Sequence, residues 1–257
     1  MIYQIKSYFQ FLLKSSNQHG IHSPFVYNLI TKCFYKKTKF PEYSTLKSLR
    51  KNLLKDNSTI DITDFGQGSR VFKTNTRKVS AIAKNAGITP KRQRLLFRLT
   101  NYLESETILE LGTSLGMATA AMALGNKDSE IITIEGCPNI ALKATQVFND
   151  FKLQNIELLN QTFEDFFSET KMEAFDLVFI DGNHNKKKTL EYFNILLDYA
   201  HNDSVFIFDD IYWSPEMTKA WHEIIQHSKI TVSIDTFYWG LVFFRKEQPK
   251  QHFHIRL

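Results

Sequence analysis

Two short glycine-containing loops carry residue types that could hold a cofactor: DFGQGSR at residues 64–70 and LELGTSLG at residues 109–116. In a parallel sheet, a cofactor loop follows the first strand and opens a helix. An acidic residue at the end of the next strand then binds the ribose hydroxyls. The second loop meets these conditions, because a helical pattern over residues 114–124 follows it and Glu135 ends the strand-like EIITIE, 23 residues after Gly112.

The first loop meets neither condition. No helical pattern opens after Arg70, and no Asp or Glu lies between Asp64 and Glu104. A lone Gly-x-Gly is most often a turn, although successive backbone N–H groups in such a bend can bind an anion. We therefore expect residues 64–70 to form either a simple turn or a lid that brings Arg70 to the substrate.

Three aspartates follow two further strand-like runs, DLVFI and SVFIF. Because neighbouring parallel strands lie about 4.8 Å apart, Asp181, Asp209 and Asp210 could share a hard cation such as Mg²⁺ or Ca²⁺. The alternative without a metal is that Asp181 orients the cofactor while Asp209 and Asp210 cap the following helix.

His184 stands three residues after Asp181. Histidine titrates near neutral pH, so this residue could accept a proton from a substrate; the alternative is an exposed loop histidine beside the lysines at residues 186–188. Tyr212 and Trp213 follow the paired aspartates. They could line an apolar or aromatic substrate, or pack beneath the helix expected at residues 214–227.

The elements that must position these residues alternate regularly from Glu106 onward. Five β-rich runs are each followed by a helical pattern, which indicates right-handed βαβ units and a mostly parallel sheet. The last two runs, ITVSIDTF and GLVFFRK, have no helix between them and are expected to form an antiparallel hairpin. We expect residues 1–88 to be a basic, mostly helical region that covers the substrate side or mediates oligomerisation, and residues 89–257 to be the catalytic domain.

The loop lacks the closely spaced second glycine of a dinucleotide loop, and ELGTSLG resembles the E-x-G-T-x-x-G loop of S-adenosylmethionine (SAM) dependent O-methyltransferases. Glu135, FDLVFIDGNH, FDD and the terminal hairpin extend the resemblance to class I SAM methyltransferases over residues 90–246. The chain looks closest to the catechol and caffeoyl-CoA branch. The resemblance implies a Rossmann-like, seven-stranded α/β sheet with a helical N-terminal extension, and methyl transfer from SAM to a small-molecule hydroxyl.

The resemblance also implies roles for individual residues. In that branch an aspartate after strand four and an Asp-Asn or Asp-Asp pair after strand five bind Mg²⁺, and a lysine at the offset of His184 accepts the substrate proton. This sequence departs from the pattern with His184 and with Asp210, where asparagine is common. Thr162 and Phe163 follow the third strand, where this family places adenine contacts, but either residue could equally be a core residue or a helix cap. The positions implied for SAM are Glu110, Gly112, Thr113, Ser114, Gly116, Glu135, Gly136, Thr162, Phe163 and Asp181.

Charge is distributed unevenly along the chain. Residues 1–105 hold 19 Lys and Arg against 5 Asp and Glu, whereas residues 106–257 hold 13 against 22. The basic half could pack against the acidic half or a second copy of the chain in a homodimer, or attract an anionic small molecule or RNA. The alternatives to a small-molecule enzyme are therefore a methyltransferase of RNA or another polyanion, and a SAM-binding protein without catalysis. Against RNA, no Asn-Pro-Pro-Tyr-like motif follows the fourth strand.

The two cysteines, Cys33 and Cys137, lie far apart without ligand-like spacing. This argues against a disulfide framework or a zinc site and favours the cytoplasm. No run approaches the roughly 18–20 apolar residues that a membrane-spanning helix needs. Ile2, Ile5, Phe9 and Leu12 instead recur at helical spacing, which predicts an amphipathic helix over residues 1–14.

Overall fold

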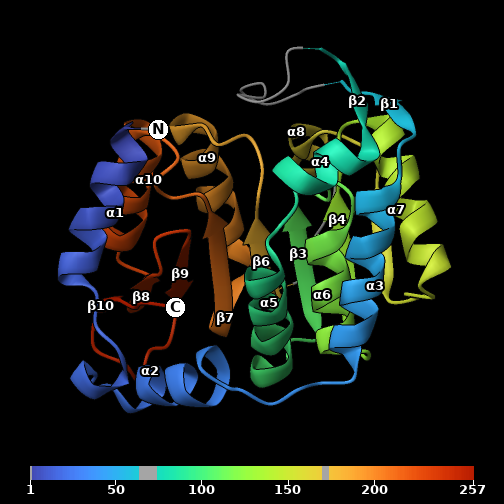
Figure 1. Cartoon of the computed structure of the whole chain (residues 1–257). Coiled ribbons are helices and arrows are strands. Elements are labelled where there is room, and N and C mark those ends of the chain that lie inside the picture. The colour runs from blue at the N-terminus through green and yellow to red at the C-terminus, as the bar shows by residue number, and fades with distance from the viewer. Residues whose placement is uncertain (1, 64–73, 170–173) are drawn as a thin grey trace. The chain divides into compact units, whose positions relative to one another are not determined.

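The computed structural model describes residues 2–63, 74–169 and 174–257 of the 257-residue chain (Figure 1). The loop at residues 64–70, and with it the predicted substrate residue Arg70, lies outside the described residues. The chain divides into two compact units: a central unit of residues 36–170, and a terminal unit of residues 1–35 and 171–257. The division at residue 88 stays a prediction.

The central unit begins with helices α3 (Glu42–Lys55), α4 (Val79–Asn85) and α5 (Pro90–Leu103). Strands β1 (Thr59–Asp61) and β2 (Thr76–Lys78) form a separate antiparallel pair between α3 and α4. Helix α5 begins at Pro90 because a proline in the first turn and a threonine before it, Thr89, favour the start of a helix. The Thr89 side chain accepts a hydrogen bond from the Arg92 backbone N–H at 3.3 Å.

Three parallel strands form the sheet of the central unit, in the order β3 (Thr107–Leu111), β4 (Glu130–Ile134), β5 (Ile156–Leu159). They are followed by α6 (Met117–Gly125), α7 (Pro138–Asp150) and α8 (Phe163–Glu169). Helix α6 is almost entirely apolar and buried, and it lies beside α5 in Figure 1. At Gly125 a Cβ atom would come within 2.7 Å of the Phe97 carbonyl oxygen, so glycine permits this close packing.

The terminal unit contains a sheet in the order β10-β8-β9-β7-β6. Its strands are β6 (Phe175–Ile180), β7 (Ala200–Asp209), β8 (Val232–Asp235), β9 (Trp239–Phe243) and β10 (Gln251–His254). Strands β6 and β7 are parallel, and β9 is antiparallel to both β7 and β8, which confirms the predicted closing hairpin. The parallel β-α units and this hairpin confirm the predicted α/β class.

The helices of the terminal unit come from both ends of the chain: α1 (Ile2–Lys14), η1 (Gln18–Gly20), α2 (Pro24–Leu29), η2 (Ile30–Phe34), α9 (Lys186–Leu196), η3 (Leu197–Tyr199) and α10 (Pro215–Gln226). Helices α1 and α10 run side by side in Figure 1, and the Tyr3 hydroxyl donates to Thr218 Oγ1 at 2.7 Å. No helix among the described residues is long and apolar enough to cross a membrane.

Strand β10 was not expected from the sequence, and it adds an eighth strand to the seven that were predicted, which correspond to β3 to β9. The segment QHFH is short and mostly polar, and its sequence does not by itself predict a strand. The strand exists because it pairs in parallel with β8, with His252 opposite Ser233 and His254 opposite Asp235. That pairing is a tertiary contact, which local patterning does not encode.

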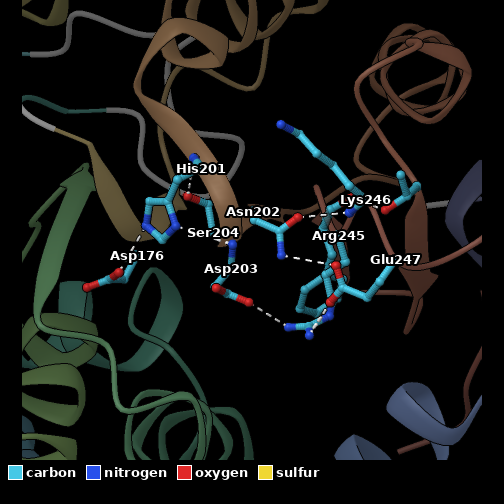
Figure 2. A network of polar contacts seen from close by, with 10 residues as sticks. Asp176, His201, Asn202, Asp203, Ser204, Arg245, Lys246 and Glu247 are labelled. Atoms are coloured by element: carbon cyan, nitrogen blue, oxygen red, sulfur yellow. Dashed lines mark hydrogen bonds and ion pairs between the residues drawn. The ribbon is translucent and has the colours of Figure 1, made fainter.

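A network of polar contacts surrounds the amino end of β7 (Figure 2). His201 Nε2 lies 3.0 Å from Asp176 Oδ1 on the neighbouring strand, and the Ser204 hydroxyl donates to the Phe175 carbonyl at 2.6 Å. Arg245, just beyond β9, forms ion pairs with Asp203 and Glu247. These contacts hold β6, β7 and β9 in register at the end of β7 opposite to its carboxyl end.

Candidate functional site

The predicted cofactor loop connects β3 to α6 in the central unit. Its backbone needs the left-handed conformation at three positions, with φ of 106° at Gly112, 49° at Ser114 and 74° at Gly116. The backbone N–H groups of Gly112 and Thr113 donate to the Ile134 carbonyl at 3.0 and 3.2 Å. The loop is therefore fastened to the carboxyl end of β4, the edge at which parallel sheets bind ligands.

Glu135 links this loop to the next one. Its Oε2 accepts a hydrogen bond from the Ser114 N–H, and its Oε1 accepts one from the Cys137 N–H, both at 2.9 Å. The carboxylate is partly exposed, and a carboxylate can accept about four hydrogen bonds. The residue predicted to bind ribose thus also determines how the two loops are arranged.

Glu110 lies inside the fold, with no exposed surface. Its Oε2 accepts hydrogen bonds from Thr119 at 2.5 Å and Thr133 at 2.6 Å, and Thr133 in turn contacts the buried Thr113 hydroxyl at 2.6 Å. Burial raises the pKa of the Glu110 carboxyl to about 8. Glu110 and Thr113 were predicted to bind the cofactor; the structure places both side chains in a buried network beneath the loop.

The predicted residues after β4 and β5 take local roles. Thr162 caps α8, because its Oγ1 accepts from the Asp165 N–H at 3.1 Å and its hydroxyl donates to the Asp165 carboxylate at 2.7 Å. Asn160, which sequence reasoning missed, donates its amide to the Glu135 and Gly136 carbonyls at 2.7 and 3.2 Å. The sequence signal that could have identified Asn160 was its position, as a polar residue directly after the β-rich run IELL. Phe163, the first residue of α8, is half-buried.

In the terminal unit, the loop after β6 brings Asp181 and His184 together. His184 Nε2 lies 3.7 Å from Asp181 Oδ1. The backbone is unusual here, with φ of 61° at Asn183 and 35° at His184. Non-glycine residues in this region store strain and are concentrated at functional sites. The His184 ring lies over Trp213, with 5.5 Å between ring centroids, so the loops after β6 and β7 meet at this pair.

The paired aspartates end β7. Asp209 is buried with 9% of its surface exposed, and Asp210 is half-buried with φ of 52°. Helix α10 is capped by Ser214, whose side chain accepts from the Met217 N–H at 3.2 Å. Within the described ranges, Asp181, Asp209 and Asp210 do not bring three carboxylate oxygens within 4.8 Å of one another.

Tyr212 and Trp213 separate, although they are adjacent in sequence. Trp213 lies against His184, whereas the Tyr212 hydroxyl donates to Asp235 Oδ2 at 2.6 Å and its ring stacks on Phe237. Burial raises the Tyr212 pKa. Of the two predicted substrate-lining residues, the structure therefore brings only Trp213 to His184.

Part of the chain is similar to known proteins. Residues 109–211 match the model of a family described as methyltransferase domain. A tRNA (guanine-N(7)-)-methyltransferase from Mycoplasma mobile is 33% identical over 95 residues, which cover 35% of this chain and 47% of that protein. The chain thus spans about half the length of this curated relative.

Two solved structures have similar folds. The O-methyltransferase from Bacillus cereus in complex with SAH has a TM-score of 0.55 at 16% identity, over 81% of this chain and 93% of that one. The O-methyltransferase TomG from Streptomyces achromogenes, involved in tomaymycin synthesis and solved with SAM, has a TM-score of 0.55 at 17% identity, over 90% and 99%. The chain has the Rossmann-like fold of these methyltransferases.

Proposed function

We propose that this protein is a SAM-dependent O-methyltransferase that acts on a hydroxyl group of a small molecule. The observation that carries the proposal is the pairing of His184 with Asp181 on a strained loop after β6. This loop lies within the segment that matches a methyltransferase domain. A methyltransferase of hydroxyl groups needs a base at the acceptor, and this pair supplies one.

The residues proposed to hold SAM fit its chemistry. Glu135 presents a partly exposed carboxylate for the ribose hydroxyls, and the backbone around Gly112 and Gly116 allows close approach of a ligand. Among the described residues, Glu110 Oε1 is a buried oxygen without a hydrogen-bond partner. Because Glu110 has no exposed surface and its pKa is raised to about 8, it supports the loop from beneath and does not meet the ligand.

His184 is proposed to be the general base. When bound, SAM supplies a methyl group on a positively charged sulfur. His184 would accept the proton of the acceptor hydroxyl as the oxygen bonds to the methyl carbon and that carbon's bond to sulfur breaks, which would leave the neutral thioether S-adenosylhomocysteine. Asp181 would stabilise the resulting imidazolium. Trp213 restricts the His184 ring and provides an apolar surface for the acceptor. Removal of the hydroxyl proton makes the acceptor oxygen more nucleophilic.

A divalent cation at Asp181, Asp209 and Asp210 stays a prediction from the sequence. Among the described residues, these three aspartates are not grouped with one oxygen from each within 4.8 Å of the others, and the proposed mechanism is written without a metal. Addition of Mg²⁺ or of EDTA to an active preparation tests the point directly, and we expect His184-dependent activity to persist in EDTA.

We further infer an acceptor that carries negative charge, since residues 1–105 hold 19 basic and 5 acidic side chains. A cytoplasmic location agrees with two free, buried cysteines. Contact with a second copy of the chain in a homodimer is an alternative role for these basic residues, and sedimentation at several salt concentrations tests it.

A second candidate function is methylation of RNA. The observation that favours it is the 33% identity over 95 residues to a tRNA methyltransferase, together with the basic first half of the chain. Transfer of radiolabelled methyl groups from SAM to a panel of hydroxyl-bearing small molecules, and in parallel to tRNA, separates the two. Label in a small-molecule ether supports the proposal; label in tRNA, or in no acceptor despite SAM binding, contradicts it.

A further inference from the structure

A cluster of metal-ligand side chains lies on the edge of the terminal unit's sheet, between β8 and β10. His252 and His254 are two residues apart in β10, so their side chains lie on the same face of the strand. Because β10 pairs in parallel with β8, these histidines lie opposite Ser233 and Asp235. One ligand atom from each of Asp235, His252 and His254 lies within 4.8 Å of the other two. No other group of three such residues is this close in the described parts of the chain.

We propose that Asp235, His252 and His254 form a binding site for a divalent transition-metal ion such as Zn²⁺. His254 Nε2 is 3.8 Å from Asp235 Oδ2, and the two histidine rings are 4.6 Å apart between centroids. Bonds of about 2.0–2.2 Å to nitrogen and oxygen place ligand atoms somewhat closer together than this, so small side-chain rotations complete the site.

Surrounding hydrogen bonds hold the ligands in position. The Asp235 carboxylate accepts from the Tyr212 hydroxyl at 2.6 Å and from the Phe237 N–H at 2.7 Å. Ser233 Oγ lies 2.8 Å from His252 Nδ1 and restricts the orientation of that ring. Metal-binding histidines and carboxylates in proteins are usually oriented by such second partners, which distinguishes this group from a chance meeting of side chains.

The chemistry of the ligands determines the class of ion. Two imidazoles and one carboxylate suit Zn²⁺, Co²⁺, Ni²⁺ or Cu²⁺, whereas Mg²⁺ and Ca²⁺ prefer oxygen ligands alone. Asp235 is buried, His254 is half-buried and His252 is exposed, so the group is open to an ion from solvent. Burial raises the Asp235 pKa to about 6, and a bound cation would stabilise the charged carboxylate.

Lys14 and His222 come from two helices that lie near the cluster. Lys14 on α1 and His222 on α10 both interact electrostatically with Asp235 and His254. They also line a cavity of about 250 Å³ together with Tyr212, the partner of Asp235. Lys14 therefore weakens the affinity for a cation, while a neutral His222 could supply a further nitrogen from the side of the cavity.

The position of the site suggests a structural consequence. β10 is the last strand of the chain, and its two histidines would be joined through the ion to Asp235 on β8. Ligand that binds only the folded state stabilises it. Zn²⁺ should therefore raise the thermal midpoint of the terminal unit and slow amide exchange in β10, without any change in methyl transfer.

The test uses the full-length protein with Co²⁺ and Zn²⁺ as probes. We expect wild type to bind one equivalent of Co²⁺, with a visible absorption band that Zn²⁺ removes and Mg²⁺ does not. His252→Ala and His254→Ala should each abolish the band. Ser233→Ala should lower the affinity roughly 10- to 100-fold, and Lys14→Gln should raise it.

Matched controls separate this site from others. His201→Ala removes a histidine that is also paired with an aspartate in the same unit, and His184→Ala removes the proposed base; both should keep the band. The two β10 variants test the site without altering Asp235, whose carboxylate accepts hydrogen bonds from Tyr212 and Phe237. The proposal is overturned if wild type binds neither ion, or if both histidine variants bind Co²⁺ as wild type does, whatever the result for methyl transfer.

Discussion

His184 Nε2 lies 3.7 Å from Asp181 Oδ1, and both residues belong to the loop that follows β6. The ring of His184 is further restricted by Trp213 from the loop after β7. The Asp181 carboxylate and the Trp213 ring lie near His184, and we propose that they orient its ring before a substrate binds. Preorganisation of this kind is what a general base requires.

His184→Gln should lower kcat for O-methylation by roughly 10²–10⁴-fold, the usual contribution of a general base. SAM affinity should change little, because the residue is proposed to act on the acceptor. Steady-state kinetics and SAM titrations measure both quantities. His201→Gln is the matched control, since that histidine also pairs with an aspartate, at the opposite end of β7. Equal kcat values for the two variants would remove His184 from the mechanism.

Glu135→Gln should weaken SAM binding by roughly 10- to 100-fold, because a hydrogen bond to a charged group is worth about 1.5–3 kcal/mol. The substitution also loosens the contacts to the Ser114 and Cys137 N–H groups. Calorimetry of SAM binding measures the loss. Glu130→Gln, at the exposed start of the same strand, should bind as wild type does. Unchanged affinity in Glu135→Gln would contradict the assignment of the ribose contact.

Glu110→Gln should change the pH dependence of stability. The pKa of Glu110 is raised from 4.5 to about 8 in the folded state. The folded state therefore keeps a proton that the unfolded chain releases, and wild type loses stability as the pH rises through this window, by at most about 1.4 kcal/mol per pH unit. The variant escapes this loss, so its stability relative to wild type should rise by several kcal/mol (about 3–5) between pH 5 and pH 9.

Urea unfolding at pH 5, 7 and 9 measures this difference. Glu157→Gln serves as a control, because Glu157 is exposed on β5 of the same sheet. Its stability relative to wild type should not vary with pH. Parallel curves for wild type and Glu110→Gln would show that Glu110 ionises normally in the folded protein.

Gly116→Ala should destabilise the central unit by about 1–3 kcal/mol through backbone strain alone, because alanine is strained at a φ of 74°. A Cβ atom there would also lie 2.3 Å from the Phe148 ring. Introducing Gly116→Ala into a Phe148→Leu background separates the two causes, since only the steric part should diminish. Gly20→Ala, where the nearest atom would be 3.4 Å away, should have a small effect in the same thermal unfolding assay.

Local patterns in the sequence were sufficient for the α/β class and for the alternating strands and helices, but not for β10. The alternation of strands with helices and the closing hairpin depend on residues near one another in the chain, and both are present. The assignment of LELGTSLG as the loop between the first parallel strand and its helix also rested on local spacing, and the structure has this arrangement.

The tertiary structure decided which side chains meet. Glu110 and Thr113 form a buried network because Thr119 and Thr133 come from a helix and a neighbouring strand. Tyr212 contacts Asp235, 23 residues away, and QHFH becomes a strand only against β8. The sequence of a single short segment does not determine which distant side chain or strand it will contact. The preference arises when the fold buries a polar group that must find a hydrogen bond, or leaves a sheet edge that can pair, and both conditions exist only in the assembled sheet.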